Sequence, residues 1–196
     1  LALQPTNPDI LVLAAGLARR LGRLDQAISI SEFLLIRDPV NVFGGYELAT
    51  SYYYAGRLDE AIATYRNDIR LFPTGTGDHE MIGEVLLIKG DARAALEEFK
   101  LEPSEPLRLT GLSMAYHALG QRAESDAALA ELVEKYEKTM AWNIALVLAF
   151  RNEADQAFAW LNKAVEYQDP TVGSTALYPL LTDLHSDPRW LPFLRK

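Results

Sequence analysis

The sequence has 196 residues, 49% of them apolar, and a formal net charge of −8 at pH 7. The acidic balance argues against nucleic acid as a partner, because phosphate contacts need clustered lysine and arginine, and no basic amphipathic stretch indicates a membrane surface. The absence of cysteine excludes disulfides, thiolate chemistry and cysteine–zinc sites. The longest apolar stretch, Ile144 to Phe150, is too short to span a bilayer.

Prolines recur every 34 residues, at Pro5, Pro39 and Pro73, and Asn7 and Asn41 keep the same register. A proline at this place stops a helix from continuing. Residues 1–7 therefore read as the end of a preceding repeat, and we expect the chain to be part of a longer array or a larger protein. A frayed N-terminus with two prolines in register by chance is the alternative.

Turn residues repeat with the same period. The segment Gly22–Ala27 recurs almost unchanged as Gly56–Ala61, 34 residues later. Each glycine allows the left-handed conformation that ends a first helix. Asp25 and Asp59 then fall in the first turn of a second helix, where a carboxylate favours the helix dipole. The same turn position is held later by Gly90, Gly120 and Asn152.

The most complete unit covers residues 42–75. Positions 7, 8, 11, 15, 20, 24 and 32 of this 34-residue unit are held by Leu48, Ala49, Tyr52, Gly56, Ala61, Tyr65 and Pro73. This spacing resembles the tetratricopeptide repeat, a helix–turn–helix, although Gly45 stands where the family has tryptophan.

The resemblance implies an all-α fold, a right-handed α-solenoid of about five helix–turn–helix pairs with a C-terminal helical cap. The expected repeats are residues 8–41, 42–75, 76–105, 106–137 and 138–171, and the cap is residues 172–196.

The segment from Trp142 to Phe150 is apolar on nearly every face, so a helix there must be covered on both sides. The nearest candidate for the cover is the tail that contains Trp190 and Phe193. A partner protein or a second copy of the chain is the alternative.

The tail itself predicts a short helix. Asp187 reads as its cap and Pro188 as its first residue, after a short turn at residues 178–181. We expect four apolar residues of this helix to pack against the helices of the fifth repeat: Trp190, Leu191, Phe193 and Leu194. The tail also resembles the D-P-R-F-x-x-L-type ending of many bacterial repeat arrays. That resemblance implies the C-terminal region of a larger bacterial regulatory or signalling protein.

The resemblance further implies which residues face the concave groove, since the first helix of each pair lines it. The candidate peptide-groove residues are Tyr46, Thr50, Tyr53, Tyr54, Glu80, Glu84, Met114, His117 and Trp142. The family's clamp for a terminal carboxylate needs a lysine at position 5, and none of the five repeats has one, so acidic C-termini are disfavoured. Aromatic rings beside Glu80 and Glu84 favour a ligand with basic and apolar groups. Alternatively, the tyrosines pack on neighbouring repeats and the glutamates are solvated.

A metal site at residues 78–84 is disfavoured. Glu80 and Glu84 share a helix face, but His79 points elsewhere, and a transition metal needs three or four converging ligands. A solvated acidic helix start is the better interpretation. With three histidines, no cysteine and no glycine-rich phosphate loop, we expect no catalytic residues, no metal and no cofactor.

The sequence therefore predicts a non-catalytic scaffold that binds a protein or peptide in its groove. The alternative is an oligomerisation or structural cap module, such as a homodimer through the ends of the array, and an enzyme is a distant third. We expect neither nucleic acid binding nor membrane insertion. The expected location is the cytoplasm, with the periplasmic part of a membrane-anchored regulator as the alternative.

Overall fold

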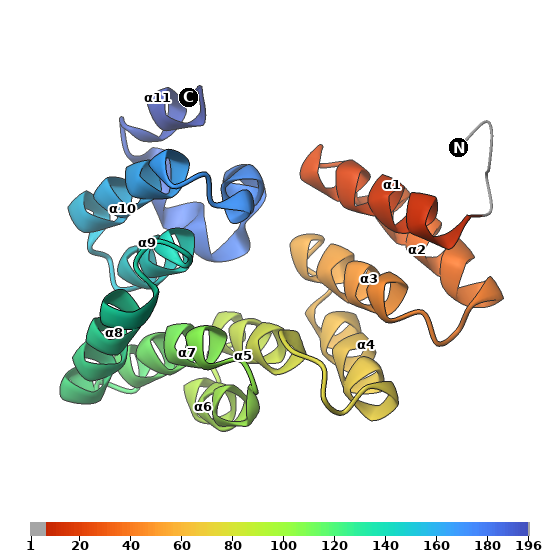
Figure 1. The fold of residues 1–196 in the computed structure, drawn as a ribbon, viewed down its shortest axis with the longest axis horizontal. Coiled ribbons are helices and arrows are strands. Elements are labelled where there is room, and N and C mark those ends of the chain that lie inside the picture. The colour runs from red at the N-terminus through yellow and green to blue at the C-terminus, as the bar shows by residue number, and fades with distance from the viewer. Residues whose placement is uncertain (1–6, 196) are drawn as a thin grey trace. The chain divides into compact units, whose positions relative to one another are not determined.

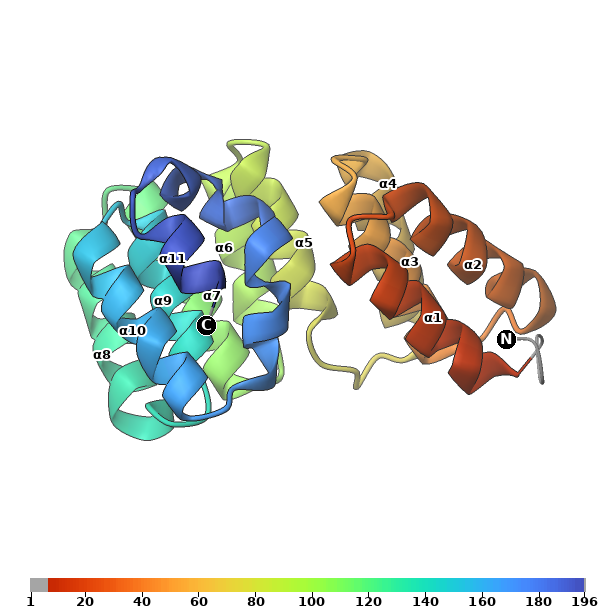
Figure 2. The same ribbon diagram turned by 90° about the horizontal axis from the view of Figure 1, so that it is seen from above.

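The computed structural model describes residues 7–195, and every regular element among them is a helix (Figures 1 and 2). The predicted all-α fold of successive helix pairs is thereby confirmed. Within the described part of the chain, no helix has both the length and the hydropathy that a membrane span requires. The chain divides into two compact units, Leu1–Val85 and Leu86–Lys196, which are described in turn.

The first unit consists of two helix pairs and the beginning of a third. Its helices are α1 (Pro8–Arg20), α2 (Leu24–Arg37), α3 (Val42–Tyr54), α4 (Leu58–Leu71) and the first part of α5 (Asp78–Ile88). Helix α1 packs on α2, α3 packs on α4, and α3 also contacts both helices of the preceding pair. Each of these four helices has a fully buried alanine: Ala15, Ala27, Ala49 and Ala61. Small side chains there let the helix backbones come together.

Local sequence explains where these helices begin and end. Asn7 and Asn41 cap α1 and α3, since their side-chain oxygens accept hydrogen bonds from the backbone N–H groups of Ile10 and Gly44 at 3.2 and 2.8 Å. Gly56 has φ of +72°, the predicted left-handed conformation. Most of the predicted end of an earlier repeat, residues 1–7 with Pro5, lies outside the described residues.

The second unit continues the pairing. Its helices are α6 (Ala92–Leu101), α7 (Glu105–Ala118), α8 (Arg122–Tyr136), α9 (Ala141–Phe150) and α10 (Ala154–Glu166). Helix α7 packs on α6 and α8, and α9 packs on α10, α7 and α8. Asn152, between α9 and α10, has φ of +61°, as expected for the residue that replaces the turn glycine.

The tail covers α9. It forms two 3₁₀ helices, η1 (Pro170–Leu177) and η2 (Pro179–Ser186), followed by the short helix α11 (Trp190–Leu194). Helix η2 packs on α9, all of whose residues from Ala141 to Ala149 are buried. The indole Nε1 of Trp142 donates a hydrogen bond to Thr175 Oγ1 at 2.8 Å, and the ring of Tyr178 meets the Trp142 ring edge-on at 4.7 Å. The tail is therefore the cover of α9, but through η1 and η2 rather than through Trp190 and Phe193.

Two details predicted for the tail are wrong. Residues 178–181 do not form an isolated turn, because they run into the eight-residue helix η2. Helix α11 begins at Trp190 and not at Pro188, because the Asp187 carboxylate instead accepts hydrogen bonds from the backbone and side chain of Arg189.

Only half of the predicted apolar contact of α11 forms. Trp190 and Phe193 are buried, whereas Leu191 and Leu194 are 62% and 40% exposed. Residues three apart share one side of a helix, so a five-residue helix can bury one such pair and must leave the other in solvent. Helix α11 contacts η2, and Arg189 anchors the segment to α10 by lying over the Phe158 ring and pairing with Asp155 at 2.7 Å.

Candidate functional site

The four tyrosine and threonine residues predicted for the groove of the second repeat form a packed cluster. Thr50 and Tyr53 are buried. Thr50 Oγ1 lies 2.9 Å from the hydroxyl of Tyr65, and the Tyr53 hydroxyl donates to Glu84 at 2.9 Å. Tyr46 and Tyr54 are half-buried, and their rings meet those of Tyr65 and Tyr53 edge-on. Their role as ligand contacts stays a prediction.

The predicted acidic groove residues have little exposed surface. Glu80 is 7% exposed and Glu84 is fully buried. Burial raises the pKa of both Tyr46 and Tyr53, and the charge of Glu84 adds to the rise at both; Glu80 adds to it at Tyr46 alone. The expected solvated acidic helix start is wrong, since Asp78 is buried too. The predicted ligand with basic and apolar groups relied on contact with Glu80 and Glu84. Because both carboxylates are buried, that ligand stays a prediction that their exposure does not support.

A further buried carboxylate, Asp68, explains the unusual glycine of the second repeat. Asp68 lies on α4 with 3% of its surface exposed, and its Oδ2 has no hydrogen-bond partner within the described residues. A Cβ atom added to Gly45 would come within 2.2 Å of Asp68 Oδ1. Only glycine leaves room for this carboxylate against α3. Burial, together with the charge of Asp78, raises the pKa of Asp68 to about 7.

In the second unit, two of the three predicted groove residues belong to the core and one borders an open hollow. Met114 and Trp142 are buried. His117 is half-exposed near the end of α7, with its ring edge-on to Phe150 at a centroid distance of 6.2 Å.

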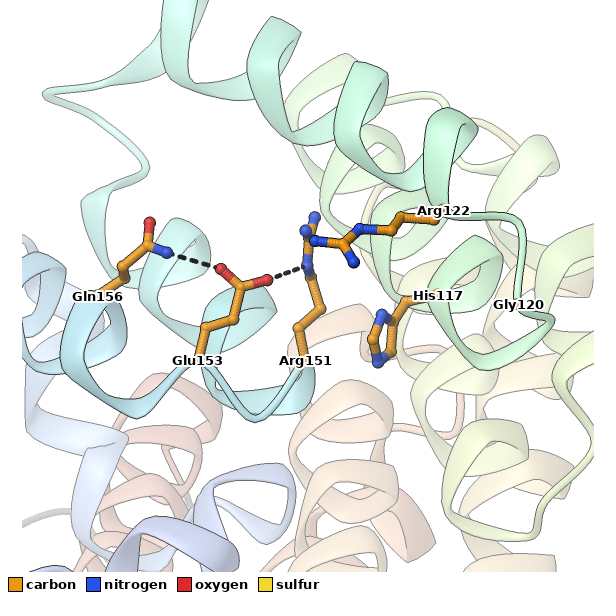
Figure 3. A pocket seen from close by; sticks show the side chains of 6 residues that line it. All are labelled: His117, Gly120, Arg122, Arg151, Glu153 and Gln156. Carbon is orange, nitrogen blue, oxygen red and sulfur yellow. Dashed lines mark hydrogen bonds and ion pairs between the residues drawn. The ribbon is translucent and has the colours of Figure 1, made fainter.

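The hollow beside His117 has a volume of about 590 Å³ and lies where the turns of two helix pairs meet (Figure 3). The ends of α7 and α9 and the starts of α8 and α10 supply its lining: His117, Gly120, Arg122, Arg151, Glu153 and Gln156. This position is the turn edge of the repeats. We call it the turn-edge hollow.

One side of the turn-edge hollow is a fixed network around Arg151. The guanidinium bonds to Glu153 through Nε at 2.7 Å and to Asp126 through Nη2, and only 6% of the side chain is exposed. Gln156 donates to the second oxygen of Glu153 at 2.8 Å. The charge of Arg151 is therefore compensated by protein carboxylates.

Arg122 and His117 also line the hollow, and in Figure 3 the Arg122 guanidinium lies beside that of Arg151. The Arg122 side chain is 85% exposed, and its Nε lies 3.8 Å from an oxygen of Asp126. An exposed ion pair of this length holds a guanidinium only weakly, so Arg122 can turn to another acceptor. The hollow thus offers an accessible guanidinium and an imidazole beside a compensated network. That arrangement is suited to a single carboxylate.

Sequence reasoning identified His117 and missed the other five lining residues. It considered only groove positions of first helices, whereas these five lie in turns or at the starts of second helices. The available signal was the pair of arginines beside turn residues: Arg122 follows Gly120 by two residues, and Arg151 precedes Asn152. Within residues 7–195 no group of three or more His, Asp or Glu side chains is arranged to hold a metal ion.

Comparison with known proteins identifies the repeats. Two sequence models, both described as tetratricopeptide repeat, match residues 46–105 and residues 109–139. A search of curated protein sequences found no match.

Several solved structures share the fold. TTC0263, a thermophilic TPR protein of Thermus thermophilus, is 20% identical, with 97% of this chain and 100% of that chain covered and a TM-score of 0.65. A tetratricopeptide repeat protein from Parabacteroides merdae is 18% identical over 88% of this chain and 70% of that chain, with a TM-score of 0.61. YrrB, described as a TPR protein with an unusual peptide-binding site, is 19% identical over 87% and 92% of the two chains, with a TM-score of 0.53.

Proposed function

Because the chain belongs to the tetratricopeptide-repeat family, we propose that it is a non-catalytic scaffold that binds a segment of another protein. The observation that carries this proposal is the turn-edge hollow, which is open to solvent and lined mainly by polar side chains. The description of the YrrB structure supports peptide binding as the mode to test.

The chemistry of the hollow favours a segment with an acidic side chain. Arg122 has an exposed guanidinium, and a carboxylate can accept two parallel hydrogen bonds from it. Gly120 has no side chain to block the approach, and His117 supplies a second polar contact. The neighbouring Arg151 is held by Glu153 and Asp126 and offers no free charge.

This ligand differs from the terminal carboxylate that the position-5 residues disfavour. That argument concerned the groove side of the first helices, whereas the turn-edge hollow lies at the ends of α7 and α9. A side-chain carboxylate within a peptide is therefore compatible with the missing lysine clamp.

The proposal can be tested with an array of immobilised peptides in three classes, each carrying one acidic, one basic or one additional apolar residue in a common neutral sequence. We expect the labelled chain to be retained most strongly on the acidic class. Arg122→Glu should abolish that preference, because it places a carboxylate against the ligand carboxylate. Arg93→Glu is the matched control, since it makes the same charge change at an exposed position of α6 away from the hollow.

Equal retention on the three classes would contradict the choice of ligand. Equal behaviour of the Arg122 and Arg93 variants would contradict the site. A chain retained by none of the peptides would contradict the scaffold function in this form.

We also propose that the chain is the C-terminal repeat region of a larger bacterial regulatory protein located in the cytoplasm. The support is the tail sequence from Asp187 to Leu194, which resembles the endings of such arrays. Sequencing the complete gene product tests this, and a reading frame without a regulatory domain would contradict it.

A further inference from the structure

His117 differs from the other residues of the turn-edge hollow in one chemical respect. Among the described lining residues it alone has a side chain whose charge changes near neutral pH. Guanidinium and carboxylate groups ordinarily keep their charges from about pH 5.5 to about pH 8.5, whereas an imidazole gains or loses a proton within about pH 5–8. The charge of the hollow therefore depends on pH through this residue.

The remaining charges at the hollow cancel one another. Arg122 and Arg151 contribute two positive charges. Glu153 pairs with Arg151, and Asp126 pairs with both arginines, so these carboxylates contribute two negative charges. The local sum is zero when His117 is neutral and becomes positive when its ring is protonated. Protonation of His117 thus decides whether the hollow attracts an anion by its net charge.

The charged groups that share the hollow with His117 come from two places in the fold. Helix α8 supplies Arg122 and Asp126, and the turn from α9 to α10 supplies Arg151 and Glu153. Helix α6 also packs on α7, but it supplies none of the described lining residues. On α7 itself, His117 is the one described lining residue.

Both nitrogen atoms of the His117 ring are available to a ligand. The ring is half-exposed and meets Phe150 edge-on at a centroid distance of 6.2 Å. A phenyl ring has no hydrogen-bonding group, so this contact limits the movement of the imidazole without using its nitrogens. Within residues 7–195 neither nitrogen has a hydrogen-bond partner. A protonated ring can therefore donate to a carboxylate in the hollow.

We propose that the turn-edge hollow binds its acidic segment together with a proton, which His117 holds. The proton-coupled site rests on the proposed function, since it concerns the carboxylate that Arg122 binds there. Arg122 and the imidazolium of His117 donate to the same carboxylate, so binding is tightest at the acidic end of the imidazole range. As pH rises through that range, the ring loses its charge and the affinity falls. By linkage, a bound carboxylate makes the ring hold its proton more tightly, so binding takes up a proton.

Fluorescence polarisation of a labelled peptide with one glutamate in a neutral sequence measures this coupling. The peptide is titrated with the chain at a series of pH values from about 5.5 to 8.5 and at constant ionic strength. A glutamate ordinarily titrates near pH 4, so the peptide keeps its charge throughout the series. We expect the dissociation constant to increase by about fivefold from the lowest to the highest pH, which is the size of a partly exposed ion pair.

Three variants assign the pH dependence to one residue. His117→Gln keeps a polar side chain that cannot ionise, so its dissociation constant should match that of the parent at pH 8.5 and stay there on acidification. His117→Arg is charged at every pH and should bind at pH 8.5 as tightly as the parent does at pH 5.5. His185→Gln is the control, because His185 is an exposed histidine of η2 that does not line the hollow. It should keep the pH dependence of the parent.

Calorimetry supplies a readout that a purely structural role of His117 would not change. Binding of the same peptide is measured near pH 6.5 in two buffers with different enthalpies of ionisation. The difference in binding enthalpy gives the number of protons taken up with the peptide. We expect a fraction of one proton for the parent and for His185→Gln, and none for His117→Gln or His117→Arg.

Two kinds of failure are distinguishable. Binding that does not change with pH, or that changes equally in the parent and in His117→Gln, would overturn the coupling to a proton and would leave the proposed function in place. A peptide that is bound at no pH would contradict the proposed function itself, and the proton-coupled site would fall with it.

Discussion

Asp68 and Leu34 occupy the same place in successive repeats, twelve residues after the turn glycines Gly56 and Gly22. Leu34 is a buried core residue, and Asp68 is equally buried. The second repeat thus has a carboxyl group where the first has a methyl-bearing side chain. Glycine at position 45 accommodates the carboxyl in space, but burial still opposes its charge.

The raised pKa of Asp68 predicts a pH-dependent stability difference. An aspartate ordinarily titrates near 3.8, and in the fold the pKa of Asp68 is about 7. The fold therefore binds the proton more tightly, so the stabilisation is fully present below the lower value and is lost as pH rises to the higher one.

An asparagine in place of Asp68 resembles the protonated form and cannot ionise. We expect the Asp68→Asn variant to match the parent near pH 4 and to exceed it at pH 8 by on the order of 1–3 kcal/mol in free energy of unfolding. Urea unfolding at a series of pH values measures the difference. A difference that does not change between pH 4 and pH 8 would contradict the raised pKa.

Gly111 is a second residue at which an added side chain should lower stability. A Cβ atom added there would lie 1.9 Å from the ring of Phe99, which is fully buried between α6 and α7. Gly111→Ala should lower the free energy of unfolding by about 1–3 kcal/mol, the usual cost of overpacking. Gly173→Ala is the control, because nothing lies within 4 Å of its added Cβ. Thermal melts that shift equally for the two variants would contradict this packing.

The sequence predicts the role of a turn glycine, but it does not predict the role of a glycine that makes room for a distant side chain. Gly56 follows a helical pattern and recurs at a fixed period, so its left-handed conformation could be predicted from neighbouring residues. Gly45 and Gly111 are required by Asp68 and Phe99, more than ten residues away. Nothing next to either glycine in the sequence indicates that contact, so only the folded chain shows its reason.

At the scale of elements, the tail and α9 depend on each other. Helix α9 is apolar on all sides, and η1 and η2 supply the surface that keeps it from water. The Trp142–Thr175 hydrogen bond satisfies the only polar atom of a buried indole.

Thr175→Val keeps the shape of the side chain and removes the acceptor for Trp142. A buried N–H without a partner costs about 1–3 kcal/mol, so we expect a loss of that size in the free energy of unfolding. Thr182→Val is the control, since the Thr182 hydroxyl donates only to Pro179 at an exposed site of η2. Denaturant unfolding of both variants checks this, and equal losses would contradict the buried role of Thr175.

The two sides of α11 give a further prediction. Phe193→Ala should lower the free energy of unfolding by about 2–4 kcal/mol, because it empties a buried site. Leu191→Ala should change it by less than about 0.5 kcal/mol, as expected for a mostly exposed side chain. Calorimetry distinguishes the two, and a larger effect at Leu191 would mean that α11 is rotated.

The sequence indicated that α9 needs a cover and that the tail supplies it, because an all-apolar helix is a local pattern. It did not indicate which part of the tail makes the contact. Proline at positions 170 and 179 opens two 3₁₀ helices, and Thr175 and Tyr178 reach Trp142 only through that path. The course of the chain through these two helices depends on tertiary packing, which the spacing of apolar residues in the sequence does not encode.

At the scale of the whole molecule, repeat proteins are built from contacts between neighbouring units. Each helix pair is therefore encoded in its own stretch of about 34 residues, and the fold class could be predicted in full. The candidate site could not. The groove residues were transferred by position within the repeat, but Thr50, Tyr53 and Glu84 make their hydrogen bonds inside the packed cluster. The turn-edge hollow arises between the turns at Gly120 and Asn152, which belong to different repeats.

Amide chemical-shift mapping tests the central claim, that this chain is a scaffold that binds a carboxylate-bearing segment at the turn-edge hollow. An isotope-labelled chain is titrated with the acidic peptide and, separately, with its amide counterpart. We predict saturable shifts confined to residues 117–122 and 151–156 with the acidic peptide, and much weaker ones with the amide. Shifts that are absent, identical for the two peptides, or centred on Tyr46 and Tyr54 of α3 would contradict the claim.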